Sequence, residues 1–358
     1  MKFRTLILLF LALALSAMVI FDSVTYSASV LGIFKDRSFS AEGLAMAESF
    51  EPPLPYSARL GAGTDSFFES VEDLSICRHR EVRRFIYLYL TRDREYLVKS
   101  IGRSRSCLPL IRKIIAEGEL PGDLALLPLL ESGFEPMAVS KSGAVGLWQF
   151  IEGTSSIMGL RRDTWVDERR HTGKSTRAAL RHLEELYRHF GTWELALAAY
   201  NGGSGHVARA MESSGSRTFW ELLQKGALRQ ETAEYVPRFA ALLVIYRNMD
   251  LLDIDDELPH AAPVPRESIA LPSSIGVDRV ATYAGIPVSM LKRLNPELNT
   301  IQPPPHQPVY TLIIPARSMK ALAARTALLA RETTAWNKPF TAYHALPILP
   351  LVSLTGRM

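Results

Sequence analysis

Apolar residues recur every three or four positions along most of the chain between residues 67 and 250. This spacing predicts amphipathic helices, because it places the apolar side chains on one face of each helix. Few stretches between these segments alternate as a strand would. We therefore expect residues 67–257 to form a mainly α domain. The clearest segments are REVRRFIYLYLTRD, EYLVKSIGRSRSCLPLIRKIIAEGE, STRAALRHLEELYRHFG, WELALAAYNGG and ETAEYVPRFAALLVIYRNM.

The pattern changes after residue 257, where LPHAAPVPRES sets prolines close together and ends the helical spacing. The residues that follow predict a strand (ESIALPS), two short helices (DRVATYAG and PVSMLKRLNP) and a closing strand (VYTLIIPA). We expect a small α/β module with the order βααβ over residues 266–316. The tail, residues 317–358, contains one predicted helix (SMKALAARTALLARE) and is otherwise unassigned.

The N-terminus has the pattern of an export signal. Lys2 and Arg4 precede an uncharged run from Thr5 to Ile20. Residues 1–28 are interpreted as a signal peptide or an N-terminal membrane anchor, and both alternatives stay open. Residues 29–66 are rich in Ser, Gly, Ala and Pro and show no sustained period, which predicts a flexible linker. The apolar run has no cysteine close behind it, which disfavours a lipid-modified N-terminus.

Composition bears on two questions: whether the protein binds nucleic acid and whether its cysteines are oxidised. Lys+Arg 41 against Asp+Glu 37 gives a formal charge of +4, which is too small to indicate nucleic-acid binding. Export would place the two cysteines, Cys77 and Cys107, in an oxidising compartment. Cys77 precedes a helix predicted over about 79–91, and Cys107 lies midway along one predicted over about 95–117. A disulfide and two separate buried thiols are both compatible with this placement.

A single acid stands out at the end of an apolar run. The segment LLPLLESGF predicts a helix from about Pro121 that ends with Glu131 in its last turn and Gly133 as its stop. The negative end of the helix dipole and a partly dry site would both raise the pKa of Glu131. A carboxyl group protonated near neutral pH can act as a general acid, whereas the alternative is a surface glutamate at a frayed helix end.

Three further segments carry polar side chains suited to a sugar. SKSGAVGLWQF is a glycine-spaced run that predicts a loop able to approach a ligand, with Trp148 as a flat face and Gln149 as both donor and acceptor. ALAAYNGG ends an apolar helix with Tyr200 and Asn201, and ETAEYVPRF adds Tyr235. Each segment alone would be weak evidence for a sugar-binding site. Together with the segment of Glu131, however, the four occur in order along one predicted domain.

These motifs resemble the family 1 lytic transglycosylases, most closely their D-type membrane-bound branch. The resemblance covers about residues 71–316 and rests on LALLPLLESGF, GAVGLWQF, ALAAYNGG and YVPR. It implies a goose-lysozyme-like helical domain over residues 67–257 that cleaves the bond between N-acetylmuramic acid and N-acetylglucosamine in peptidoglycan without water. Glu131 would be the general acid and then the base, and Ser132, Trp148, Gln149, Tyr200, Asn201 and Tyr235 would bind substrate.

The same resemblance implies neither a cofactor nor a metal, and we expect a monomer. Retaining and inverting glycosidases pair two carboxylates, whereas these motifs supply no second acid, and Glu135 and Glu152 are interpreted as surface residues. A lone acid favours participation by the acetamido group of the substrate. A lysozyme-like muramidase and a catalytically inactive peptidoglycan-binding protein are the alternatives.

The chain departs from the family pattern at several places. His171 follows the arginine pair Arg169 and Arg170 where an aspartate is usual, Glu234 precedes Tyr235 in place of asparagine, and Gly202 replaces an alanine. Residues 266–316 resemble a diverged LysM module that lacks the Gly-Asp-Thr turn, so sugar binding and packing against the catalytic domain are alternative roles; the tail would be a truncated second module. The charged stretch 161–174 is expected to be solvated, with binding of peptide carboxylates as the alternative.

Overall fold

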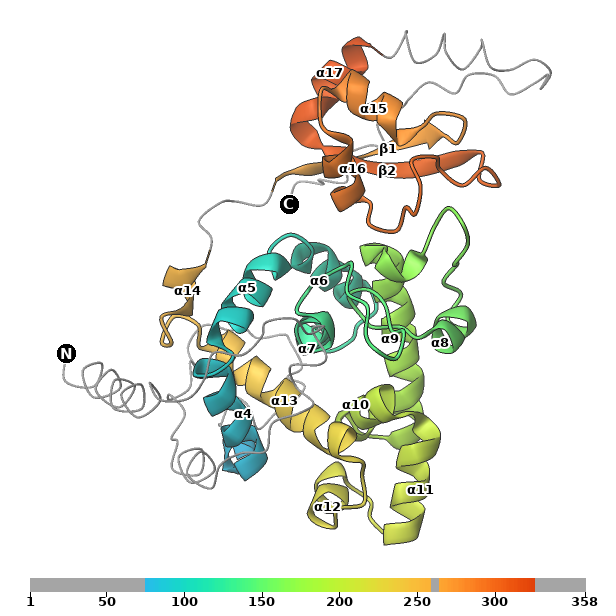
Figure 1. Cartoon of the computed structure of the whole chain (residues 1–358). Helices are drawn as coiled ribbons and strands as arrows, with labels where there is room; N and C mark the ends of the chain where they lie inside the picture. The colour runs from blue at the N-terminus through green and yellow to red at the C-terminus, as the bar shows by residue number, and fades with distance from the viewer. Residues whose placement is uncertain (1–74, 259–263, 326–358) are drawn as a thin grey trace.

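The computed structural model describes residues 75–258 and 264–325, which form a helical unit and a small α/β module (Figure 1). The mainly helical fold class is confirmed. The predictions for residues 1–66 and 326–358 fall outside the described residues. The helical unit consists of η1 (Ser75–Arg78), α4 (Arg80–Leu90), α5 (Arg94–Ser104), α6 (Leu108–Glu117), η2 (Gly122–Leu126), α7 (Leu127–Ser132), α8 (Glu152–Ile157), η3 (Glu168–Arg170), α9 (Thr172–Phe190), α10 (Trp193–Gly202), α11 (Ser204–Ser214), α12 (Phe219–Gln224), α13 (Gln230–Arg247) and α14 (Ile254–Glu257).

Helix α13 is the centre of the helical unit. It packs against α4, α10 and α7, and its residues from Tyr235 to Ile245 are buried apart from Arg238. Because a helix buried on most of its faces must be apolar around its circumference, the run FAALLVI is continuous and shows little amphipathicity. The active-site candidates Tyr235 and Glu131 thereby lie on two helices, α13 and α7, that contact each other.

Two predicted helices differ in the structure, and proline explains both. The helix expected over 95–117 is broken into α5 and α6, because an unbroken helix would drive the ring of Pro109 into the carbonyl of residue 105; Pro109 instead occupies the first turn of α6. The helix that carries the acid begins at Leu127 rather than near Pro121, with Pro128 in its first turn and the 3-10 turn η2 before it. Its end at Gly133 is as predicted.

The cysteines are both buried and both free, the second of the two alternatives. Cys77 lies in η1 and Cys107 caps the N-terminus of α6. Burial raises the pKa of each thiol to about 11, so both side chains are protonated and unreactive at neutral pH.

The module has the predicted order of strand, helix, helix and strand. Strands β1 (Arg266–Pro272) and β2 (Val309–Pro315) pair antiparallel with Ile269 opposite Leu312, and α15 (Val277–Ala284) and α16 (Val288–Leu294) connect them. The turn η4 (Ala316–Ser318) and α17 (Met319–Ala324) follow. The module lies at one end of the helical unit, and α11 and α12 lie at the other (Figure 1).

The module has its own apolar core, which one residue of the helical unit, Val166, joins. Within residues 75–258 and 264–325, no helix combines the length and the apolar composition needed to cross a membrane.

Candidate active site

The candidate acid, Glu131, lies in the last turn of helix α7 and is partly buried. The Oη hydroxyl of Tyr235 on α13 donates a hydrogen bond to Oε1 of Glu131. Burial raises the pKa of Glu131 from its usual value near 4.5 to about 7, the bond from Tyr235 lowers it, and the charge of Glu231 raises it. About half of the Glu131 side chains are therefore protonated near neutral pH, which is the state a general acid needs.

The turn after the acid is fixed by its contacts with helix α5. Gly133 has φ +57°, and a Cβ there would lie 2.5 Å from the hydroxyl oxygen of Tyr96 and 2.6 Å from that of Ser100. Arg103 Nε donates to the carbonyl oxygen of Gly133 at 2.7 Å. Only glycine fits here, so the direction of the chain beyond Glu131 is set by α5.

Two residues expected to bind substrate are instead structural. Ser132 is fully buried, and its hydroxyl contacts the carbonyl oxygens of Pro128 at 3.2 Å and Leu147 at 3.0 Å, which ties α7 to the glycine loop. Trp148 is also fully buried, and its indole N–H donates to Thr176 Oγ1 at 2.9 Å. The prediction that Trp148 offers a face to a sugar is wrong, because the apolar core takes up the ring.

Gln149, in contrast, keeps a free acceptor. Its backbone has φ +48°, which is strained for a residue with a side chain, and its Nε2 donates to the carbonyl oxygen of Gly146 at 2.8 Å. Its Oε1 is buried and has no hydrogen-bond partner among the described residues. A buried acceptor left unpaired is costly, so a donor supplied by a ligand would be stabilising here.

The glycine loop that carries Gln149 (residues 140–150) is closed by short backbone pairs. Val145 pairs with Phe150, and Gly146 N donates to the carbonyl oxygen of Ala138 at 2.9 Å. Gly146 has φ +85°, and a Cβ there would lie 2.1 Å from the carbonyl oxygen of Arg169. The loop therefore has this shape only with glycine at 146.

We expect Gly146→Ala to lower the free energy of unfolding by about 3 kcal/mol, because it adds a steric overlap to a backbone conformation that already disfavours a side chain. Gly143→Ala is the matched control, since Gly143 has φ +79° but open space around it. Its expected loss is about 1 kcal/mol. Chemical denaturation measures both losses, and equal values would contradict the close approach of Arg169 to Gly146.

Tyr200 and Asn201 both lie at the end of helix α10, partly exposed. The hydroxyl of Tyr200 donates to the carbonyl oxygen of Trp148 at 2.9 Å, and Asn201 Oδ1 accepts from Thr232 Oγ1 at 3.1 Å. A Cβ at Gly202 would lie 2.5 Å from that same Thr232 hydroxyl, which explains the first glycine of ALAAYNGG.

The structure accounts for the two other departures from the family pattern. His171 Nδ1 accepts from the backbone N–H of Lys174 at 3.3 Å and so caps helix α9, a task that aspartate also performs well. Glu234 pairs with Arg238 on its own helix and with Arg84 on α4, the latter at 3.7 Å. These contacts join α13 to α4 next to Tyr235.

The charged stretch 161–174 was expected to be solvated, but its residues from Val166 to Arg169 are buried. Asp167 and Arg169 form a bidentate ion pair at 2.7 and 2.9 Å. Burial alone would raise the pKa of Asp167, but its bonds and charge interaction with Arg169 lower it below the usual value. The prediction missed this because a run of charges is solvated more often than buried, and only the tertiary contacts reveal the difference.

Sequence reasoning also missed Glu231 and Thr232, in the first turn of α13. Glu231 is exposed, and its negative charge raises the pKa of Glu131. It lies on α13 one helical turn before Tyr235, the residue that bonds to Glu131. Their only sequence signal was proximity to Tyr235. Both Glu135 and Glu152 were expected to be surface residues. Glu152 is exposed and pairs with Arg162, whereas Glu135 is partly buried and accepts from the backbone N–H of Met137.

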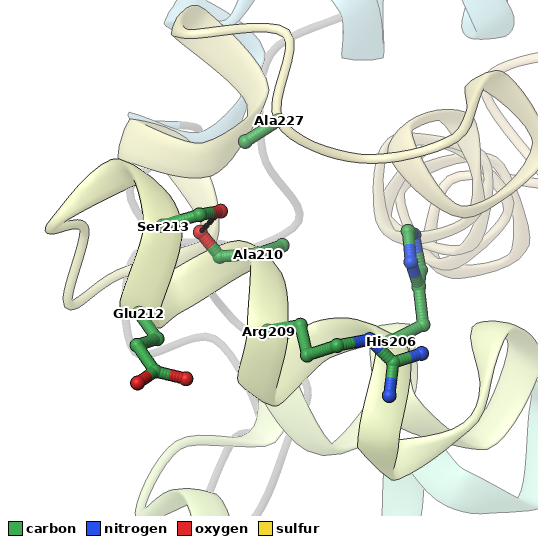
Figure 2. A pocket seen from close by; sticks show the side chains of 6 residues that line it. All are labelled: His206, Arg209, Ala210, Glu212, Ser213 and Ala227. Carbon is green, nitrogen blue, oxygen red and sulfur yellow. Dashed lines mark hydrogen bonds between the residues drawn. The ribbon is translucent and has the colours of Figure 1, made fainter.

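A hollow of about 600 Å³ lies elsewhere, along helix α11 (Figure 2). His206, Arg209 and Glu212 line it, and the carboxylate of Glu212 points away from the other two side chains in Figure 2. His206 Nε2 accepts from the backbone N–H of Arg229 at 3.3 Å. Neither Glu131 nor Gln149 lines this hollow, so it is separate from the acid. No group of three or more His, Cys, Asp or Glu side chains that could hold a metal occurs in the described part of the chain.

Residues 111–223, within the helical unit, match the family model of the Transglycosylase SLT domain. Membrane-bound lytic murein transglycosylase D of Escherichia coli (strain K12) is 36% identical over 214 residues, 57% of this chain and 45% of that protein. The resemblance to the family 1 lytic transglycosylases is confirmed. A putative tributyltin chloride resistance protein of Alteromonas sp. (strain M-1) is 39% identical over 115 residues, 31% of this chain and 56% of that one. The chain spans about half the length of these relatives.

Solved structures show a partial similarity. The 70-kDa soluble lytic transglycosylase of Escherichia coli has a TM-score of 0.37 at 18% identity, covering 52% of this chain and 38% of that one. An inactive mutant of lytic transglycosylase Slt from Pseudomonas aeruginosa has a TM-score of 0.35 at 17% identity, covering 60% and 38%.

Proposed function

We propose that this chain is a peptidoglycan lytic transglycosylase that cleaves the β-1,4 bond between N-acetylmuramic acid and N-acetylglucosamine and leaves a 1,6-anhydro end. The observation that carries the proposal is a carboxyl group with a pKa of about 7, Glu131, held by Tyr235 next to the loop that carries Gln149. The SLT-domain match and the named relatives support the same chemistry.

In the first step, protonated Glu131 gives its proton to the glycosidic oxygen, and the bond to the anomeric carbon breaks. The acetamido group of the substrate stabilises the positive charge that develops at that carbon. Ionised Glu131 then accepts the proton of the sugar's 6-hydroxyl as its oxygen attacks the same carbon, so the acid is regenerated. Tyr235 donates to the carboxylate between the two steps. The pKa of Tyr235 is raised well above its usual value by burial and by Glu131, so it remains a donor.

The surrounding side chains would position the sugar. Gln149 Oε1, the buried acceptor without a partner, suits the N–H of an acetamido group. Tyr200 and Asn201 lie at the end of α10 with part of their surface exposed and complete the set. Preorganised donors and acceptors of this kind contribute by fixing the reacting atoms rather than by chemistry of their own.

Glu231 is the residue that could turn this site into a two-carboxylate hydrolase, because its charge acts on Glu131. We expect Glu231→Gln to keep the rate within about threefold and to lower the pKa of Glu131 slightly, since one neighbouring negative charge is removed. The pH dependence of glycan cleavage measures both. A loss comparable to that of Glu131→Gln would assign Glu231 a catalytic role and contradict the single-acid mechanism.

We place the protein at the cell envelope. The export pattern of residues 1–28 and the membrane-bound name of the relative support this location, and an uncleaved N-terminal segment would provide membrane attachment. The proposed partner is the glycan strand of peptidoglycan, bound by a monomer.

The test is a product analysis. Purified protein is incubated with sacculi and the released fragments are weighed by mass spectrometry. The proposal predicts muropeptides lighter by one water than the reducing form. Reducing ends would indicate a muramidase, and binding to sacculi without release would indicate an inactive wall-binding protein.

A further inference from the structure

The module and the helical unit meet at the segment 161–170, named here the bridging loop. Asp167 N donates to the carbonyl oxygen of Glu297 at 2.8 Å, and Asn299 N donates to that of Trp165 at 2.8 Å. These bonds form a short antiparallel bridge in which Val166 faces Leu298. The bridging loop is thus paired to the module as a strand is paired in a sheet.

The contact has an apolar centre and satisfied charges. Val166 is 2% exposed and belongs to the core of the module, not to that of the helical unit. Glu297 accepts from the hydroxyl of Tyr310, and Glu168 accepts from Lys174 Nζ at 2.5 Å. Burial and the charges of Glu297 and Glu168 raise the pKa of Tyr310. The carboxylate of Glu168 in the bridging loop therefore lies close to Tyr310 of the module. Buried polar groups paired in this way indicate a defined interface rather than a passing contact.

The other side of the bridging loop supports the glycine loop. Arg169 is 4% exposed and is held by Asp167, whose backbone N–H bonds to the module. Its Nη1 reaches the carbonyl oxygens of Gly143 at 3.4 Å and Phe150 at 3.3 Å, and its own carbonyl oxygen fills the space beside Gly146. Gly143 and Phe150 enclose Gln149 in the sequence. A continuous set of contacts therefore runs from the module to the residue with the free acceptor.

We infer that the module is a positioning element of the active site: by holding the bridging loop, it fixes Arg169 and through it the glycine loop that carries Gln149. This inference rests on the proposed function for its catalytic consequence, but its structural part does not. It gives the module a role that requires no affinity for sugar, and it makes Asp167, Arg169 and Val166 positioning residues.

Val166→Asp in the full chain tests the inference, because it places a charge in the core of the module without touching the core of the helical unit. Hydrogen exchange measured without substrate should rise about tenfold at the amides of Val145, Gly146 and Phe150, which donate to the carbonyl oxygens of Phe150, Ala138 and Val145, while α13 keeps its protection. Cleavage should slow about tenfold with its pH midpoint unchanged, since Glu131 keeps its surroundings. Val166→Ile, which keeps an apolar side chain at this position, should leave the exchange rates and the cleavage rate at their wild-type values.

Val309→Asp is the matched control, since Val309 belongs to the module but is 45% exposed on β2, and it should change neither quantity. Asn299→Ala is a milder second variant that removes side-chain bonds to the carbonyl oxygen of Asp163 at 3.0 Å and to Arg170 at 3.3 Å. Its effect should have the same pattern at smaller size.

Faster exchange confined to the bridging loop, with the glycine loop as protected as in wild type, would overturn the inference. If wild type released no anhydro products, the proposed function would fail while the exchange result still decided the structural claim.

Discussion

Glu131→Gln should reduce the release of anhydromuropeptides by about 10⁴-fold, because one group performs both proton transfers and glutamine can perform neither. The variant should still bind sacculi, since the amide has the shape of the carboxyl group and Gln149, Tyr200 and Asn201 are unchanged. Turnover and pelleting with insoluble sacculi measure the two properties separately. Glu135→Gln, the same substitution four residues on, is the matched control and should cleave at nearly the wild-type rate.

Stability gives an independent check that the loss is chemical. The pKa of Glu131 is about 7 in the folded chain and near 4.5 when unfolded, so the folded state binds more protons between these values. Wild type therefore loses stability as the pH rises through this window, whereas the glutamine variant does not. At pH 8 the variant should be more stable by up to about 3 kcal/mol, and near pH 4 the two should be equal. A variant that is inactive because it is unfolded would show the opposite order.

Tyr235→Phe should lower the maximal rate about 100-fold and shift the pH profile. The Tyr235 hydroxyl bonds to Glu131 and lowers its pKa, so its removal raises that pKa above about 7. Because the protonated acid is the active form, the activity that falls as pH rises should persist to higher pH, with the midpoint moved up by about one unit.

Tyr200→Phe is the control for this shift. The hydroxyl of Tyr200 bonds to the carbonyl oxygen of Trp148 rather than to Glu131, although the charge of Glu131 contributes to the raised pKa of Tyr200. The midpoint should therefore stay in place even if the rate falls. A midpoint that moved down in Tyr235→Phe, or equally in both variants, would contradict the assigned bond.

Local rules predicted most of the elements. The prolines before the module, the glycine stop after Glu131 and the alternation in β1 and β2 act over a few residues, and the structure has the corresponding elements there. The helix over 95–117 failed because its spacing is continuous through Pro109, and apolar spacing alone does not show that a proline breaks a helix.

Local sequence patterns do not predict contacts between distant segments of the chain. Trp148 was expected to offer its ring to a sugar, because a tryptophan beside glycines has the same sequence signature whether it faces solvent or the core. The bridging loop looked solvated because nothing in its charges shows that Asp167 and Arg169 pair with each other and that Val166 packs on residues more than a hundred positions later. Glu131, Gln149 and Tyr235 were singled out from their motifs, but the hydrogen bond from Tyr235 to Glu131 follows from the packing of α7 on α13.

The most direct test of the single-acid mechanism is the source of the oxygen at the new chain end. Purified protein is incubated with soluble glycan strands in water enriched in oxygen-18, and the muramyl end of the product is analysed by mass spectrometry. Intramolecular attack by the 6-hydroxyl predicts an anhydro end with no label. Incorporation of the label at the anomeric carbon would show that water is the nucleophile and would contradict the mechanism proposed for Glu131.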